Sequence, residues 1–286
     1  MELLEEILTK DNLNRAYKKV YQNKGASGVD GISVYEIKEY IQNNSDEILN
    51  QIRNRKYKPQ PVRRVQIPKE NGKKRNLGIP TVMDRIIQQA MVQVLSRIYE
   101  EQFSDNSYGF RANRSCEQAV IKALEYLNDG NDWIVDIDLE KFFDTVNQDR
   151  LITIIRRTIK DGDVVSLIMK YLKAGVMENG KVKTTKVGTP QGGNLSLVKS
   201  EKAAIRVLNS ITKYIEKKLG LKVNAEKSKV TRPTQTKYLG FSFWKSAGGK
   251  WKPKPHLKSY LNIDRLRKRG LIFLLDQYQK VHVEIN

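Results

Sequence analysis

An apolar run that ends in carboxylates, Trp133-Ile-Val-Asp-Ile-Asp138, restricts the fold more than any other segment of the chain. Its residues are apolar on both alternating sides, which is typical of a strand buried on two faces. We therefore expect it to be a central strand of an antiparallel sheet that is flanked by helices. Strand alternation places Asp136 and Asp138 on the same side of this strand.

Carboxylates at the end of an apolar strand are costly unless a cation meets them. A hard divalent ion such as Mg²⁺, which prefers oxygen ligands, is one such cation. The alternative is a strand end whose acids cap the next helix. We prefer the metal for Asp138. We prefer the cap for Asp144, because Asn147 and a predicted helix lie just beyond it.

The rest of the chain mixes helical and strand patterns, so the sequence predicts an α+β fold. Thr81-Val-Met-Asp84 has the spacing of a helix cap, and the apolar residues that follow share one helical face. Asn71-Gly72 and Asn179-Gly180 are hairpin-turn signals. Helices are predicted over 1–20, from Thr81 onward, and over 115–127, 147–159, 163–173 and 200–219, the last ending at Gly220; strands are predicted over 62–67, 176–182, 221–223 and 238–244.

The charge of the chain is strongly positive, with 52 Lys and Arg against 32 Asp and Glu. Residues 181–269 hold 23 basic and four acidic side chains, and residues 53–75 hold ten and one. Two such basic segments predict contact with phosphate backbones. One cysteine and two histidines exclude a disulfide scaffold and a Cys/His zinc site. No apolar run approaches the roughly 20 residues of a membrane span, so we expect a cytoplasmic protein without a membrane partner.

Further motifs stand on both sides of the aspartates in a defined order. They are Ile67–Pro80 and Ser107–Ser115 upstream, and Gly188–Asn194, Leu221–Lys229 and Tyr238–Phe241 downstream. In this order and spacing they resemble the sequence blocks of group II intron-type reverse transcriptases, from about Asn23 to about Trp244. The resemblance implies a right-hand polymerase with fingers and an N-terminal extension in 1–127, a palm in 128–245, and a tail in 246–286 that is not thumb-like.

The same resemblance implies roles for single residues. Asp138 would be the first-block catalytic aspartate and would hold Mg²⁺, or Mn²⁺ in its place, together with the Leu139 carbonyl. Lys227 would protonate the leaving diphosphate. The implied partners are an RNA template (group II intron RNA), a DNA primer and dNTPs. The dNTP would contact Lys69, Arg75, Phe143, Gln191 and Gly192, and template or primer would contact Arg63, Arg64, Ile79, Pro80 and Arg111.

One block of the family pattern is missing. A helix and a hairpin bearing Tyr-x-Asp-Asp should follow the Gly188–Asn194 motif, yet no Asp-Asp dipeptide occurs in the 286 residues. We place the shortening near 196–197 and expect an incomplete palm sheet. The sequence thus predicts a reverse transcriptase by lineage that is catalytically defective. Two alternatives stay open: a non-catalytic, maturase-like protein that binds intron RNA, and a metal-dependent nuclease that uses Asp136, Asp138 and Asp144.

Overall fold

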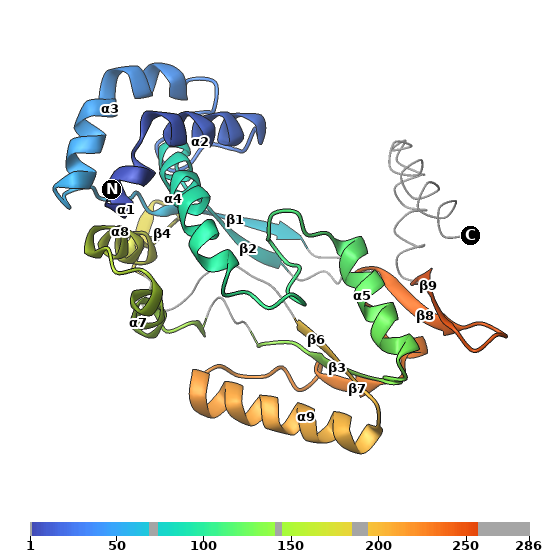
Figure 1. The fold of residues 1–286 in the computed structure, drawn as a ribbon. Helices are drawn as coiled ribbons and strands as arrows, with labels where there is room; N and C mark the ends of the chain where they lie inside the picture. Colours follow the sequence, from blue (N-terminus) through green and yellow to red (C-terminus); the bar gives the residue numbers. More distant parts are fainter. Residues whose placement is uncertain (1, 69–73, 141–144, 185–193, 257–286) are drawn as a thin grey trace. The chain divides into compact units, whose positions relative to one another are not determined.

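The computed structural model describes residues 2–68, 74–140, 145–184 and 194–256 (Figure 1). The chain divides into two compact units, and each unit is built from two separate stretches. Unit 1 comprises Met1–Ser104 and Lys141–Gln191, and unit 2 comprises Asp105–Glu140 and Gly192–Asn286. The boundaries expected for fingers, palm and tail remain predictions.

Helix α4 (Val82–Glu100) is the central helix of unit 1. Thr81 caps it as predicted, because its hydroxyl accepts a hydrogen bond from the Asp84 N–H at 3.1 Å. The predicted apolar face of α4 is buried, and helices from both chain stretches complete the core around it. These helices are α1 (Leu3–Ile7), α2 (Lys10–Gln22), α3 (Ile37–Arg53), α7 (Gln148–Thr158) and α8 (Gly162–Lys173).

The sheet of unit 1 has the strand order β2-β1-β4-β5. Strands β1 (Val62–Pro68) and β2 (Lys74–Ile79) form the predicted basic hairpin, whose turn at 69–73 lies outside the described residues. Strands β4 (Val176–Glu178) and β5 (Lys181–Lys183) form the second predicted hairpin. Its turn residues Asn179 and Gly180 have φ values of 52° and 75°, the left-handed backbone that a tight two-residue hairpin turn requires.

The sheet of unit 2 confirms the prediction for the aspartate strand. Strand β3 (Trp133–Ile137) lies between β6 (Asn194–Val198) and β7 (Lys229–Thr231), and both neighbours are antiparallel to it. Helix α5 (Cys116–Asn128) covers one face of β3, while helix α9 (Glu201–Tyr214) covers the other. A π-helical segment η1 (Ile215–Leu219) extends α9 and ends at Gly220, as predicted, where the backbone is left-handed.

Strand β6 includes the two residues at which the sequence pattern indicated a shortening. Ser196 pairs with Val135 and Leu197 with Ile134, so both belong to one continuous antiparallel strand. The first residue of that strand, Asn194, pairs with Ile137. The N-terminal end of β6 therefore lies beside the end of β3 at which Asp138 follows.

Two predicted strands differ from the structure. Residues 221–223 form no strand and make only an isolated bridge between Leu139 and Val223. The strand predicted from Tyr238 begins later, as β8 (Phe241–Lys245), because Leu239 and Gly240 have φ values of 49° and 93° and make a tight turn instead. Strand β8 pairs with β9 (Trp251–Pro255). Among the described residues, no helix combines the length and the apolar character that crossing a membrane requires.

Candidate active site

Asp138 is the residue that follows β3, and its backbone is held by the turn at residues 224–228. The Asp138 N–H donates to Ser228 Oγ at 3.0 Å. The Asp138 carbonyl accepts from the Asn224 N–H at 2.8 Å and from the Ser228 hydroxyl at 3.2 Å. The N–H and the carbonyl of Asp138 are thus both hydrogen-bonded to a segment about 90 residues later in the sequence. These bonds fix the backbone from which the Asp138 carboxylate projects.

The carboxylate of Asp138 is paired with Lys227, so the two residues to which the sequence assigned catalysis lie together. Lys227 Nζ is 3.2 Å from Asp138 Oδ2, and the exposed fractions of the two side chains are 65% and 28%. The Lys227 N–H donates to Asn224 Oδ1 at 3.2 Å within the same turn. This arrangement can place a proton donor beside the carboxylate, because the ammonium group carries three N–H donors.

Asp136 lies one alternation earlier on the same side of β3 and is half-buried. Burial raises the pKa of its carboxyl above the ordinary value, and the negative charge of Asp138 adds to this rise. Lys229, which pairs with Asp136 across the sheet, lowers the pKa and so opposes them. The carboxyl of Asp136 is therefore less acidic than that of an ordinary aspartate, because burial disfavours its charged form.

The Leu139 carbonyl was predicted as a metal ligand. Leu139 forms the bridge to Val223, but the hydrogen bonds of that bridge come from its neighbours: Glu140 N–H donates to the Lys222 carbonyl, and Asn224 N–H to that of Asp138, each at 2.8 Å. This pattern does not use the Leu139 carbonyl, which suits its predicted role.

The Asp138 carboxylate and the Leu139 carbonyl are oxygen donors of the kind that a divalent ion needs, but they are too few to complete its coordination. A carboxylate and a carbonyl are the oxygen donors that Mg²⁺ prefers, yet they supply only two of its roughly six ligands. In the described part of the chain, no group of three or more His, Cys, Asp or Glu side chains could hold a metal. The strands beside β3 bring Asn194 and Lys229 to this end of the sheet, not a second carboxylate. Asp144, the third acid of the nuclease alternative, lies outside the described residues.

Two arginines predicted to contact template or primer are bound within the chain. The Arg63 guanidinium donates to the Ser27 carbonyl through Nε at 3.1 Å and through Nη2 at 2.7 Å. Arg111 Nη1 donates to the Ser107 carbonyl at 2.8 Å. Arg64, Ile79 and Pro80 are half-buried in or beside the basic hairpin. All five roles remain predictions.

The predicted dNTP contacts are outside what the structure describes. Lys69, Phe143, Gln191 and Gly192 fall in the undescribed ranges, and only the backbone of Arg75, in β2, is described. The sequence interpretation in turn missed the backbone support of Asp138. The signal available for it was Asn224 followed four residues later by Ser228, because such side chains bond to nearby backbone groups in turns.

A second feature that the sequence interpretation missed is the anchoring of the glycine-rich loop at 23–31. Arg85 Nη2 donates to the Ala26 carbonyl at 2.6 Å, beside the Arg63 contacts with Ser27. A Cβ on Gly28 would lie 2.5 Å from the Thr81 Cα, so only glycine lets the loop approach the start of α4 this closely.

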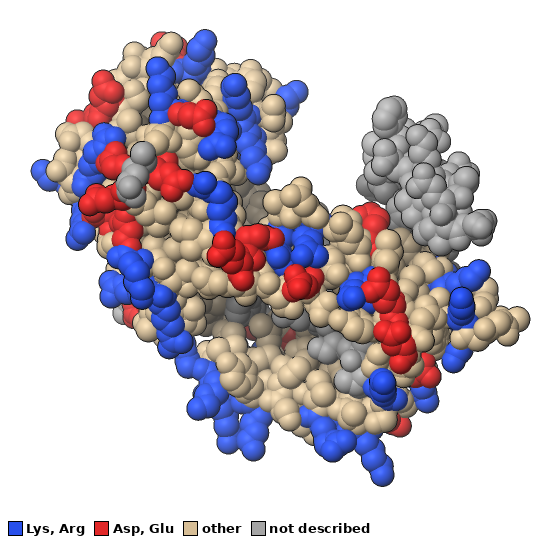
Figure 2. Space-filling view, viewed as in Figure 1, with Lys and Arg blue, Asp and Glu red and all other residues tan. Residues whose placement is uncertain are grey.

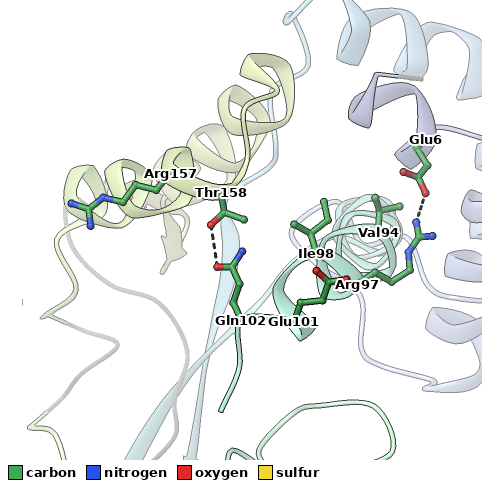
Figure 3. Close-up of a pocket in the computed structure, with 8 residues that line it drawn as sticks. All are labelled: Glu6, Val94, Arg97, Ile98, Glu101, Gln102, Arg157 and Thr158. Atoms are coloured by element: carbon green, nitrogen blue, oxygen red, sulfur yellow. Dashed lines mark hydrogen bonds and ion pairs between the residues drawn. The ribbon is translucent and has the colours of Figure 1, made fainter. Parts of the chain in front are cut away.

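A pocket of about 600 Å³ lies in unit 1, and its lining includes none of the predicted site residues (Figure 3). The Glu6 carboxylate pairs with Arg97 on its wall, and the Thr158 hydroxyl donates to Gln102 Oε1 at 3.2 Å. Its polar groups are thus largely engaged with each other. The pocket is lined by Glu6, Val94, Arg97, Ile98, Glu101, Gln102, Arg157 and Thr158.

Comparison with known proteins gives a consistent set of relatives. A family model described as reverse transcriptase (RNA-dependent DNA polymerase) matches residues 67–216. The group II intron-encoded protein LtrA of Lactococcus lactis subsp. cremoris is 43% identical over 202 residues, which cover 68% of this chain and 32% of LtrA. The protein YkfC of Escherichia coli (strain K12) is 34% identical over 222 residues, covering 76% of this chain and 57% of YkfC. The chain therefore spans about a third to just over half of these relatives.

Among solved structures, a chain of the partial Cas6-RT-Cas1–Cas2 complex aligns with a TM-score of 0.46 at 18% identity. The alignment covers 76% of this chain and 43% of that one.

Proposed function

The chain belongs to the reverse transcriptase (RNA-dependent DNA polymerase) family, and we propose that it is a group II intron-type member that binds RNA but does not synthesise DNA by itself. The predicted family and the α+β fold are both confirmed. The proposed RNA partner is a group II intron RNA. A DNA primer and dNTPs would be the substrates of a chain that contained the missing Tyr-x-Asp-Asp block. A cytoplasmic location remains a prediction.

The observation that supports an inactive chain is the composition of the sheet around Asp138. Nucleotidyl transfer of this kind depends on two divalent ions about 3.5–4 Å apart, held in line with the attacking and leaving oxygens. Asp138 and Leu139 would hold one Mg²⁺, with water in most of its remaining positions. Neither Asn194 nor Lys229, the residues that β6 and β7 bring to this end of β3, is a carboxylate.

The remaining residues of the site have roles that follow from their own chemistry. Lys227 would protonate the leaving diphosphate, because its ammonium group lies 3.2 Å from the Asp138 carboxylate that would hold the metal ion. A bound Mg²⁺ would polarise phosphate oxygens and neutralise developing charge. On the basic hairpin, Arg64, Lys69, Lys74 and Arg75 are the proposed contacts for phosphate groups, because Arg forks onto phosphate oxygens and Lys acts as a point charge.

Two measurements on the same preparation test this proposal. The first is binding of a transcribed group II intron RNA across a salt series, for which we expect an affinity that falls steeply with salt. The second is primer extension on an RNA template with Mg²⁺ or Mn²⁺, for which we expect no product. Template-dependent extension that Asp138→Ala abolishes would overturn the inactive assignment, and absence of salt-dependent RNA binding would overturn the binding assignment.

A grafted chain provides the matched control. Because β6 begins at Asn194, a helix and a hairpin bearing Tyr-Ala-Asp-Asp should be inserted between Gly193 and Asn194, so that β6 keeps its pairing with β3. We expect extension by the grafted chain alone, with circular dichroism showing that both proteins are folded. Extension by neither chain would mean that more than the missing block is defective.

A further inference from the structure

The outer side of helix α9 and its extension carries a row of basic side chains, here called the α9 stripe: Lys202, Arg206, Lys213 and Lys217. All four are exposed. Spacings of four, seven and four residues place them on one side of the helix. At 1.5 Å per residue the row is about 20 Å long. Figure 2 shows Lys and Arg side chains projecting along the edge of unit 2 where α9 lies in Figure 1.

The direction of the α9 stripe is fixed by the core on the other side of the helix. Ala204 is fully buried there, and Val207, Leu208 and Ile211 pack with it against Val135 and Ile137 of β3. Turning the stripe inward would expose this apolar surface and bury four charges. The basic side chains therefore stay on the solvent side.

The α9 stripe differs from other exposed basic side chains in its lack of acidic partners in the part of the chain that the structure describes. Within the described ranges, none of its four side chains forms an ion pair. In unit 1, by contrast, Arg53 and Arg97 on exposed helix surfaces pair with Glu5 and Glu6. Like charges four residues apart on a helix repel each other. Arg206 Nε donates to the Lys202 carbonyl at 3.3 Å, but this bond adds no negative charge to the stripe. An external polyanion would relieve the repulsion between the four basic side chains.

We propose that the α9 stripe binds the phosphate backbone of a folded RNA, at a place separate from the site around Asp138. This inference rests on the RNA-binding function proposed above. Asn209 and Ser210 are exposed between the charges and supply hydrogen-bonding groups. Ile205 and Tyr214 are 47% and 59% exposed and border the row, where they can contact sugars and bases.

The separation from Asp138 follows from the alternation along β3. Val135 and Ile137 face α9, whereas Ile134 packs in the cluster that contains α5. Asp136 and Asp138 are two and four residues after Ile134, so they lie on the same face as Ile134, opposite to α9. The sheet and the α9 helix itself stand between the stripe and any nucleic acid held at Asp138. RNA on the stripe is therefore an additional contact and not part of the template path.

The test compares two variants of the full chain that lose the same charge. The stripe variant replaces Lys202, Arg206, Lys213 and Lys217 with Gln, a residue of similar helix propensity. The control variant replaces four other exposed lysines of unit 2, at and beside β8 and β9: Lys237, Lys250, Lys252 and Lys254. The readout is the slope of log affinity against log salt for the intron RNA.

We expect the stripe variant to reduce this slope by about 3, because each lost phosphate contact removes about 0.7–0.9. The control variant should reduce it by less than about 1. Equal slopes in the two variants would overturn the inference, since only overall charge would then matter, and so would an unchanged slope in the stripe variant. If the unaltered chain shows no salt-dependent binding, the proposed function fails instead.

A crosslinking measurement tests the location directly. Cys116 is exposed, so it is first replaced with Ser. A photo-crosslinker is then attached at Asn209→Cys, inside the stripe, or at Ala247→Cys, an exposed position between β8 and β9. We expect RNA adducts at residue 209 well above those at 247. Equal or reversed yields would contradict an RNA site on α9.

Discussion

The hydroxyl of Ser228 bonds to both backbone groups of Asp138: it accepts from the Asp138 N–H at 3.0 Å and is 3.2 Å from the Asp138 carbonyl, to which it donates. One side chain thereby ties the turn at 224–228 to the end of β3. A hydroxyl carries one donor and two acceptor lone pairs, so this use of it is chemically complete.

Removing that hydroxyl should loosen the position of Asp138. We expect Ser228→Ala to lower the free energy of unfolding by about 1–3 kcal/mol, because two hydrogen bonds of about 0.5–1.5 kcal/mol each are lost at a half-buried position. Ser228→Thr keeps the hydroxyl and should lose less than half of this. Urea denaturation measures both values, and amide exchange at Asp138 should be faster only in the Ala variant.

Asp136 should make stability depend on pH. Burial raises its pKa, so the folded chain binds this proton more tightly than the unfolded chain does. The resulting stability is present below the unfolded pKa near 3.8 and is lost as pH rises through the higher folded value. Asp136→Asn should therefore gain stability relative to the parent chain between about pH 4 and pH 7.

A substitution of Lys229 should have the opposite effect on stability near pH 7 to that of Asp136→Asn. It lowers the pKa of Asp136, so Lys229→Gln should let that pKa rise further and enlarge the loss of stability toward pH 7. Urea unfolding at both pH values measures these differences. A pH-independent difference between Asp136→Asn and the parent would contradict the assignment.

Asp84 should be among the most sensitive positions in unit 1. Its carboxylate is 1% exposed and accepts from the Tyr57 hydroxyl at 2.7 Å, the Thr81 hydroxyl at 2.8 Å and the Gln60 N–H at 3.1 Å. We expect Asp84→Ala to cost about 3–5 kcal/mol, since three donors lose their acceptor. Tyr57→Phe removes one donor and should cost about 1–2 kcal/mol. Equal costs for the two variants in urea unfolding would contradict this account.

Gly28 and Gly109 should respond differently to the same added methyl group. A Cβ at Gly28 meets the backbone of Thr81 at 2.5 Å, whereas a Cβ at Gly109 meets nothing within 4 Å. We expect Gly28→Ala to cost about 1–3 kcal/mol, because the loop must move away from α4. Gly109→Ala should change thermal stability by less than about 0.5 kcal/mol. Equal melting temperatures of the two variants would show that the loop gives way without cost.

Arg63 and Arg64 are neighbours with different expected effects on RNA binding. Arg63 already donates twice to the Ser27 carbonyl. Because these bonds occupy its guanidinium, we expect no RNA contact from Arg63, contrary to the role predicted from the sequence. Arg64→Ala together with Lys74→Ala should reduce the salt slope of RNA binding by about 1.5, at about 0.7–0.9 per contact. Adding Arg63→Ala should change this slope little but should increase proteolysis of the loop that contains Ser27. A further fall in the slope would instead place Arg63 on the RNA.

Local sequence signals predicted the parts of the fold that depend on neighbouring residues. The cap at Thr81, the turn at Asn179-Gly180 and the end of the helix at Gly220 each need only a few adjacent residues, and all are present. The run from Trp133 predicts a central strand because it has apolar side chains on both faces, Ile134 on one and Val135 and Ile137 on the other.

The features of the fold that the sequence did not predict depend on contacts between distant residues. The spacing of Asn224 and Ser228 indicates a turn, but it does not show that Ser228 bonds to Asp138. Nor does any local pattern show that Arg63 and Arg85 both bind the glycine-rich loop. The segment at 221–223 contains Leu and Val in a strand-like pattern, yet it forms a single bridge. The Lys222 carbonyl accepts from the Glu140 N–H, and the neighbouring Asn224 N–H donates to the Asp138 carbonyl. Both partners follow the end of β3, so the pairing depends on the tertiary fold and not on the local pattern.

The division of each unit between two chain stretches has a consequence for synthesis on the ribosome. Strand β3 is synthesised before both of its neighbours, β6 and β7. In β7, the residue that pairs with Val135 is Val230, which follows 95 residues later. At about 5–20 residues per second, this strand waits roughly 5–20 s with an unpaired edge. During that interval an apolar segment is exposed to other chains, so slow translation or the absence of a chaperone should favour aggregation before folding begins.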